Sequence, residues 1–94
     1  MAKLQESAIR QALKELTGWE LTEEGLRKKF EFAGFPEAVR FVDRLVQPAE
    51  AAQHHPNIAV VYRWVTLILT THDEGGVTQK DIDLARAIER LQAP

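Results

Sequence analysis

The apolar positions of residues 3–16 predict an amphipathic helix. Four apolar side chains recur there at the spacing of one helix face: Ile9, Ala12, Leu13 and Leu16. Recurrence with a period near 3.6 residues indicates a helix that buries one side against a core. Gly18 follows the last of these positions, and a glycine is common just beyond the end of a helix.

A second apolar stripe predicts a helix over residues 36–53. Pro36 suits the first turn, where the missing N–H would have no intrahelical acceptor. The side chains expected on the buried stripe are Val39, Val42, Leu45, Val46 and Ala49. Pro48 lies inside this stripe, and an interior proline removes a hydrogen bond and clashes with the preceding turn. We therefore expect a kink at Pro48, or a separation of the last turns.

Alternating apolar and polar positions predict two strands between these helices. Residues 19–21 indicate a short strand, and residues 26–33 a longer one with one wet face. A turn containing Gly25 would join them. Lys28 breaks the alternation, because it falls on the side of the apolar residues.

Two further strands are predicted after Pro56. Residues 58–62 and 64–72 are rich in the β-branched and aromatic side chains that favour strands. A tight reversal near residues 62–63 would join them as a hairpin. Val65, Leu67 and Leu69 would then share one face of the second strand, and His72 would lie at its C-terminal end.

The last element predicted is a helix that ends near Leu91. Residues 78–81 (Thr-Gln-Lys-Asp) form a variant capping box after the loop at residues 75–76. The order of elements is thus α-β-β-α-β-β-α. It predicts an α+β fold in which a single domain, residues 1–94, packs its helices on one face of a four-stranded antiparallel sheet.

Composition and charge narrow the classes of partner. The net charge is −2, from 12 basic and 14 acidic residues, and the one basic run, residues 27–29, is short. This balance does not favour nucleic acid, whose binding proteins usually carry a basic excess. The chain has no cysteine, which excludes disulfides and thiolate chemistry. No membrane-spanning stretch or signal-like start is present, so we expect a cytoplasmic protein.

Three histidines are the candidates for chemistry: His54, His55 and His72. All three fall at predicted element ends, where reactive side chains are often displayed, and imidazole exchanges protons near neutral pH. A metal site built from them would have a spacing unlike that of common ligand motifs. Ser7 is the only serine and lies far from any histidine, which disfavours a serine triad. Spacing alone also permits three ordinary polar surface residues.

A longer pattern connects the histidines to a known family. Glu50 is followed after three positions by His54-His55-Pro56, Tyr62 after five more, His72 after nine more and Asp81 after eight more. Gly18-Trp19 and Phe30-Glu31-Phe32 add further matches. This arrangement resembles the signature of the pterin-4a-carbinolamine dehydratase family, and the likeness covers nearly the whole chain.

The resemblance implies a fold, a reaction and a set of site residues. The family fold has the same α-β-β-α-β-β-α order. Its reaction removes water from a 4a-hydroxy-tetrahydropterin and leaves a quinonoid dihydropterin, with no metal or other cofactor. By carry-over, His54 and His72 would share the acid and base roles, while His55 would hold the pterin or tune its neighbours. The supporting residues implied are Glu50, Pro56, Trp19 and Asp81.

The resemblance also implies partners. It implies a homodimer or a homotetramer, as in family members. The reaction would serve tetrahydrobiopterin recycling beside an aromatic amino acid hydroxylase. An alternative role is that of a non-catalytic dimerisation module, of the kind that acts as a transcriptional coactivator. In that case the helix face carrying Val39, Val42 and Val46 would meet a partner instead of the core.

Asp81 keeps a purely structural explanation, since a capping box needs an acid there.

Overall fold

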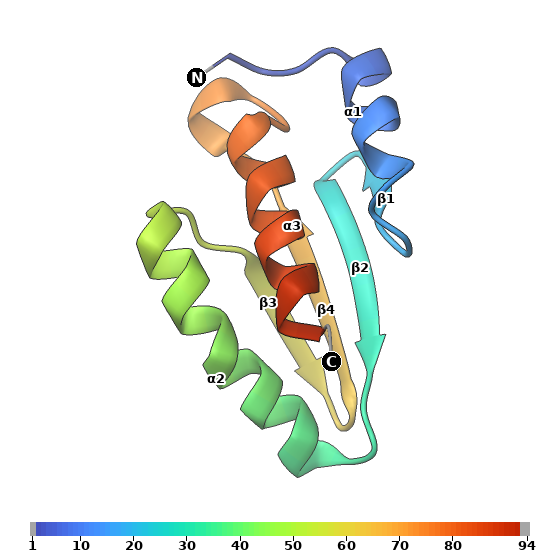
Figure 1. Cartoon of the computed structure of the whole chain (residues 1–94), viewed down its shortest axis with the longest axis vertical. Coiled ribbons are helices and arrows are strands. Elements are labelled where there is room, and N and C mark those ends of the chain that lie inside the picture. The colour runs from blue at the N-terminus through green and yellow to red at the C-terminus, as the bar shows by residue number, and fades with distance from the viewer. Residues whose placement is uncertain (1, 93–94) are drawn as a thin grey trace.

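The computed structural model describes residues 2–92 and shows three α-helices, four strands and one short 3₁₀ turn (Figure 1). In chain order the elements are α1 (Glu6–Leu13), β1 (Glu20–Thr22), β2 (Gly25–Glu31), α2 (Phe35–Ala52), β3 (Asn57–Val61), β4 (Trp64–Leu69), η1 (His72–Glu74) and α3 (Gln79–Gln92). This order confirms the predicted α-β-β-α-β-β-α arrangement.

The four strands form one antiparallel sheet in the order β1-β2-β4-β3. The central pair, β2 and β4, runs in register from Leu26 opposite Leu69 to Glu31 opposite Trp64. The predicted hairpin between β3 and β4 turns at Tyr62 and Arg63, as expected. β3 is an edge strand of the sheet, and all five of its residues are exposed.

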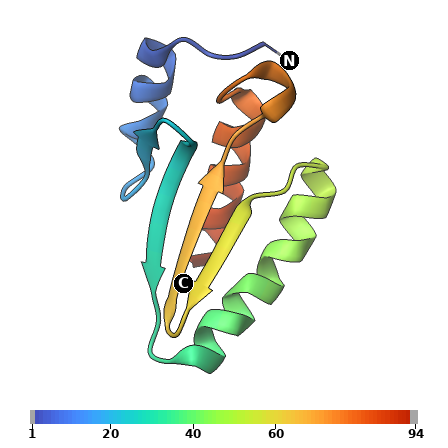
Figure 2. The ribbon, with the colours of Figure 1, turned by 180° about the vertical axis from the view of Figure 1, so that it is seen from behind.

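Helices α2 and α3 cover one face of the sheet, while the other face stays open, as Figures 1 and 2 show from opposite sides. Val65, Leu67 and Leu69 point from β4 into the layer between sheet and helices, and none is exposed. Phe41 and Leu45 of α2 and Ile88 of α3 are buried with them. The α+β class and the packing on one face are thereby confirmed.

The first helix is shorter than its apolar pattern predicted. Residues 2–5 are not helical, and the Leu4 N–H donates to the Val77 carbonyl (2.8 Å), which fastens this segment beside the loop before α3. After Leu13 the chain continues in tight turns, with i→i−3 hydrogen bonds in place of a regular helix. Ile9 and Leu16 are nevertheless buried, so the apolar stripe was correct where the helix limits were wrong.

The second helix runs through Pro48 without separating, which corrects one expectation. Proline costs one backbone hydrogen bond, but Ala49 is buried immediately after it and Gln53 closes the helix in a left-handed conformation (φ 50°). The buried stripe matches the prediction at Leu45 and Ala49 and differs elsewhere. Ala38 and Phe41 complete it, while Val39 and Val46 are exposed.

Two further predictions concern polar residues near the sheet. Lys28 does lie on the apolar side, where its ammonium pairs with Glu89 of α3 (2.9 Å). His72 does not end β4, because that strand stops at Leu69 and His72 begins η1 instead. An isolated bridge between Thr71 and Gly76 closes this loop. No helix within residues 2–92 is long and apolar enough to cross a membrane.

Candidate active site

Three chain segments that are distant in sequence meet around one small cavity of about 310 Å³. They are the end of α2, the loop after β4 and the start of α3. The left-handed residue after α2 turns the chain back, and the His54 N–H donates to the Ala49 carbonyl (3.1 Å). Residues lining the cavity are Gln53, His54, His55, Thr70, Thr71, His72, Asp73 and Lys80. The structure thus brings all three predicted histidines together.

His54 is held by a carboxylate that is completely buried. Its Nε2 lies 2.5 Å from Oδ1 of Asp81, and the exposed fractions of the two side chains are 12% and 0%. The other oxygen of Asp81 accepts the Thr71 hydroxyl (2.9 Å) and the Thr78 backbone N–H (2.9 Å). Buried carboxylates are stable when paired and fully hydrogen-bonded, and this one is both.

Asp81 also completes the predicted capping box of α3. Its carboxylate reaches back to the N–H of Thr78, and the Thr78 hydroxyl accepts the Lys80 N–H (3.3 Å). The helix N-terminus favours a negative charge at this position. The structural and the chemical explanations of Asp81 therefore hold together, since one oxygen caps the helix while the other meets His54.

His55 has a carboxylate partner of a different kind. Its Nε2 lies 2.5 Å from Oε2 of Glu50, and both side chains are more than 60% exposed. His55 borders both the histidine cavity and a smaller apolar groove of about 180 Å³ between α2 and β3. Pro56 and Glu50 line the groove and not the histidine cavity.

His72 and Trp19 have contrasting positions. The His72 side chain is exposed at the cavity and makes no hydrogen bond to any other described residue in the range 2–92. Trp19 is buried in the core, edge-on to Phe30, and donates its indole N–H to Glu89 (3.0 Å). Within one chain the structure does not bring Trp19 to the histidines.

Sequence reasoning did not single out several residues of the cavity, namely Gln53, Thr70, Thr71, Asp73 and Lys80. A signal for two of them was present, because Thr70-Thr71-His72 is a polar run that directly follows an apolar strand. The hydrogen bonds of Thr71 to Asp81 and Thr78 join residues seven to ten positions apart, and no periodicity indicates such contacts.

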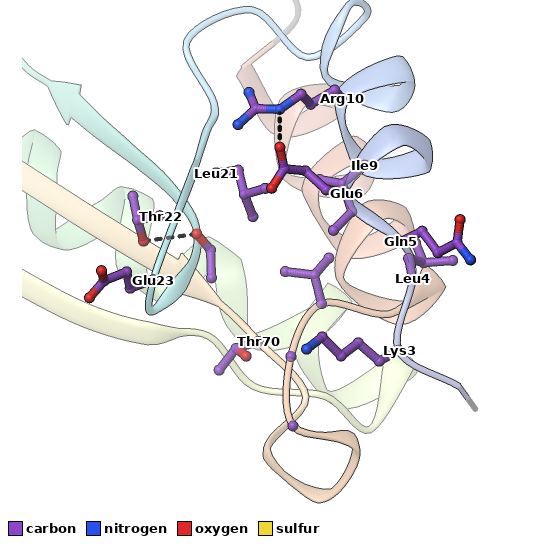
Figure 3. A pocket seen from close by; sticks show the side chains of 14 residues that line it. Lys3, Leu4, Gln5, Glu6, Ile9, Arg10, Leu21, Thr22, Glu23 and Thr70 are labelled. Atoms are coloured by element: carbon purple, nitrogen blue, oxygen red, sulfur yellow. Dashed lines mark hydrogen bonds and ion pairs between the residues drawn. The ribbon is translucent and has the colours of Figure 1, made fainter.

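A larger cavity of about 870 Å³ lies elsewhere, between α1, the β1–β2 turn and the loop at residues 75–77 (Figure 3). Lys3, Ile9 and Leu21 line it, and an ion pair between Arg10 and Glu6 lies at its border (2.9 Å). None of the histidines and none of the predicted supporting residues reach it. Within residues 2–92 no cluster of three or more histidine and carboxylate side chains has the geometry of a metal site.

A two-layer α+β fold with a histidine cavity, backed by a buried carboxylate, defines a protein equipped for proton transfer without a nucleophilic serine or cysteine. Residues 2–91 match the family model described as pterin 4 alpha carbinolamine dehydratase. The chain belongs to this family, whose members are lyases.

Relatives from distant organisms match over almost their whole lengths. A protein of Picosynechococcus is 45% identical over 95% of this chain and 97% of its own, and one of Thermomicrobium roseum is 44% identical over 97% and 98%. Both have been assigned as pterin-4-alpha-carbinolamine dehydratases. A crystal structure from Brucella melitensis, described as a transcriptional coactivator/pterin dehydratase, has a TM-score of 0.90 and 34% identity, over 97% of this chain and 99% of that one.

Proposed function

We propose that the histidine cavity dehydrates a 4a-hydroxy-tetrahydropterin by acid–base catalysis. The single observation that carries this proposal is the pairing of His54 with the fully buried Asp81 at the edge of a cavity that His55 and His72 also line. Membership of the dehydratase family supplies the substrate class. The reaction would serve the recycling of tetrahydrobiopterin after an aromatic amino acid hydroxylase has used it.

The elimination needs two proton transfers. The N5–H bond of the pterin breaks, the N5 electron pair forms the N5=C4a double bond, and the C4a–O bond breaks as the hydroxyl leaves with an added proton as water. A base must accept the N5 proton and an acid must protonate the hydroxyl. The products are a quinonoid dihydropterin and water, so no electrons are exchanged with an outside acceptor.

His54 and His72 are the residues proposed for these two transfers. His54 has a fixed ring, because a buried carboxylate holds one of its nitrogens. His72 lies at the same cavity with its ring free of other described side chains, so it can approach a bound substrate. His55 would hold the pterin, and its exposed pairing with Glu50 suits a residue at the entrance.

The test is to mix the purified chain with freshly generated 4a-hydroxy-tetrahydropterin and to follow dehydration by absorbance. We expect a rate well above the spontaneous one, and a loss of about 10²–10⁴-fold in His72→Ala, the usual contribution of one acid–base group. Lys29→Ala, on the open face of the sheet and away from the cavity, is the control. A wild-type rate equal to the spontaneous rate would exclude the proposal.

Prior incubation with EDTA should leave this rate unchanged, because the proposed chemistry uses only imidazole and carboxylate groups. A rate that EDTA abolishes, and that added divalent metal restores, would replace this mechanism with a metal-dependent one.

A second function is favoured by the exposed apolar side chains of α2 and β3. Val39, Val46 and Ile58 are each more than 40% exposed, and such clusters commonly mark interaction surfaces. We propose that this surface supports homodimers or homotetramers, or contacts with another protein as a coactivator-type module. Sedimentation of wild type and Val46→Glu would test it. If both sediment as monomers, the surface does not mediate self-association.

A further inference from the structure

A chain of hydrogen bonds behind His54 has a definite direction. The Thr71 hydroxyl donates its proton to Oδ2 of Asp81 (2.9 Å) and lies 2.8 Å from the Thr78 hydroxyl. A hydroxyl has only one proton to donate. Since Thr71 has used its proton on Asp81, Thr78 must be the donor in the contact between the two threonines. The Thr78 oxygen in turn accepts the Lys80 N–H (3.3 Å).

The donors around Asp81 favour its ionised carboxylate form. Its Oδ2 already receives two donors, the Thr71 hydroxyl and the Thr78 N–H, in a site with no exposure to solvent. Hydrogen bonds to an ionised acceptor are the strong ones, and a carboxylate accepts on both oxygens because it has no proton to donate. The contact between Oδ1 and His54 must therefore be donated by the histidine, from Nε2.

The consequence lies on the other side of the ring. When Nε2 carries a proton towards Asp81, neutral His54 has its free electron pair on Nδ1. No described residue in the range 2–92 hydrogen-bonds Nδ1, and His54 lines the cavity. Nδ1 is thus the atom left to exchange a proton with a substrate.

We propose that Thr71 is a positioning residue which, with Thr78, orients Asp81 so that His54 keeps its proton on Nε2 and presents Nδ1 to the substrate. Thr71 itself is neither the acid nor the base, because its hydroxyl donates its one proton to Asp81. The inference rests on the proposed function for its catalytic consequence, but not for the tautomer of His54.

The location of Thr71 explains why it can act in this way. Its backbone N–H donates to the Gly76 carbonyl (3.0 Å), and its own carbonyl accepts the N–H groups of Glu74 (3.0 Å) and Gly76 (3.3 Å). These bonds hold the residue before His72 rigidly beside the N-terminus of α3. The hydroxyl therefore has a fixed origin, which a positioning hydrogen bond requires.

The first measurement is the tautomer of each histidine in the full-length wild-type chain, by long-range ¹H–¹⁵N correlation spectra at a pH where the rings are neutral. We expect His54 to be protonated on Nε2, with the free electron pair on Nδ1. A wild-type His54 protonated on Nδ1 would overturn the proposal, and this outcome needs neither a variant nor enzyme activity.

The second measurement compares Thr71→Val, which removes the hydroxyl and keeps the shape, with Thr71→Ser, which keeps the hydroxyl. We expect Thr71→Val to give a mixed tautomer signal for His54 and to lower kcat by roughly tenfold or more, with KM within about twofold, because small misplacements of a catalytic group are costly. Thr71→Ser should restore both properties. Thr66→Val, on β4 and outside the cavity, is the control, because no described residue in the range 2–92 hydrogen-bonds the Thr66 side chain.

The outcomes separate this proposal from the proposed function. If the wild type does not exceed the spontaneous rate, the function fails, while the His54 spectra still decide the role of Thr71. If the wild type is active and Thr71→Val matches Thr66→Val in both kcat and the His54 signal, Thr71 has no positioning role. A Thr71→Val variant that does not fold leaves the wild-type tautomer and the Thr71→Ser rate as deciding measurements. A Thr71→Ser variant whose kcat is lowered by roughly tenfold or more would then show that the Thr71 hydroxyl does not position Asp81.

Discussion

His54 and His55 are neighbours in sequence, and each meets a carboxylate at the same nitrogen–oxygen distance of 2.5 Å. Their surroundings differ. The side chains of His54 and Asp81 are 12% and 0% exposed, whereas those of His55 and Glu50 are 63% and 67% exposed. Water and salt screen the exposed pair, and such pairs contribute about 0–1 kcal/mol. The two pairs therefore share a contact distance but differ in how strongly water and salt weaken them.

The comparison also separates partners by origin. Glu50 precedes His55 by five residues and comes from the same helix end, so their pairing needs only local structure. Asp81 is 27 residues from His54 and belongs to another helix, so that pairing exists only in the folded chain. The buried pair thus forms only when the fold is complete, whereas the exposed pair can form within one helix end.

The largest expected difference is in catalysis. His54→Ala should lower kcat for dehydration by about 10²–10⁴-fold, because it removes a group that transfers a proton. His55→Ala should act mainly through a higher KM, since the residue is proposed to hold the pterin. Steady-state rates with freshly generated substrate measure both. Equal losses of kcat in the two variants would remove the distinction between the pairs.

The next difference is in stability. Asp81→Asn should lower the free energy of unfolding by about 1.5–3 kcal/mol, because the hydrogen bonds from His54, Thr71 and Thr78 lose a buried charged acceptor. Glu50→Gln, the matched change in the exposed pair, should lower it by less than about 1 kcal/mol. Urea unfolding at one fixed protein concentration gives both values. A loss of similar size in both variants would show that burial does not set the strength of these pairs.

The order of elements was predictable because it depends on local patterns. The strand faces of β4 and the capping box at Thr78 follow from spacings of two and three residues, and both are confirmed. The helix limits were less predictable, since the hydrogen bond from Leu4 to Val77 ends α1 early by a contact across 73 positions. The buried stripe of α2 also differed from prediction, because neighbouring elements decide which apolar residues are covered.

The candidate site was predictable in its histidines and not in its second layer. The signature placed His54, His55 and His72 in one site, and the cavity brings them together. Trp19 shows the limit of such a signature. Its match to the family pattern does not say where the side chain lies, and in this chain it packs in the core. The role of Thr71 depends on the direction of hydrogen bonds, which only three-dimensional contacts reveal.

A smaller difference is expected in chemical reactivity. Diethyl pyrocarbonate acylates accessible imidazole nitrogens, so His55 and His72 should react before His54, whose side chain is largely covered. Mass spectrometry of peptides from a time course identifies the order. Reaction at His54 as fast as at His55 would show that the cover over the His54 side chain does not protect its ring in solution.

The smallest expected difference is the response to salt. At about 1 M ionic strength the Debye length is about 3 Å, which is short enough to screen an exposed ion pair. The ring signals of His55 should therefore shift between low and high sodium chloride as its contact with Glu50 weakens. Those of His54 should stay in place, because Asp81 has no exposure to the ions. Equal shifts at both rings would mean that salt reaches Asp81, and the distinction between a buried and an exposed pair would then fail in solution.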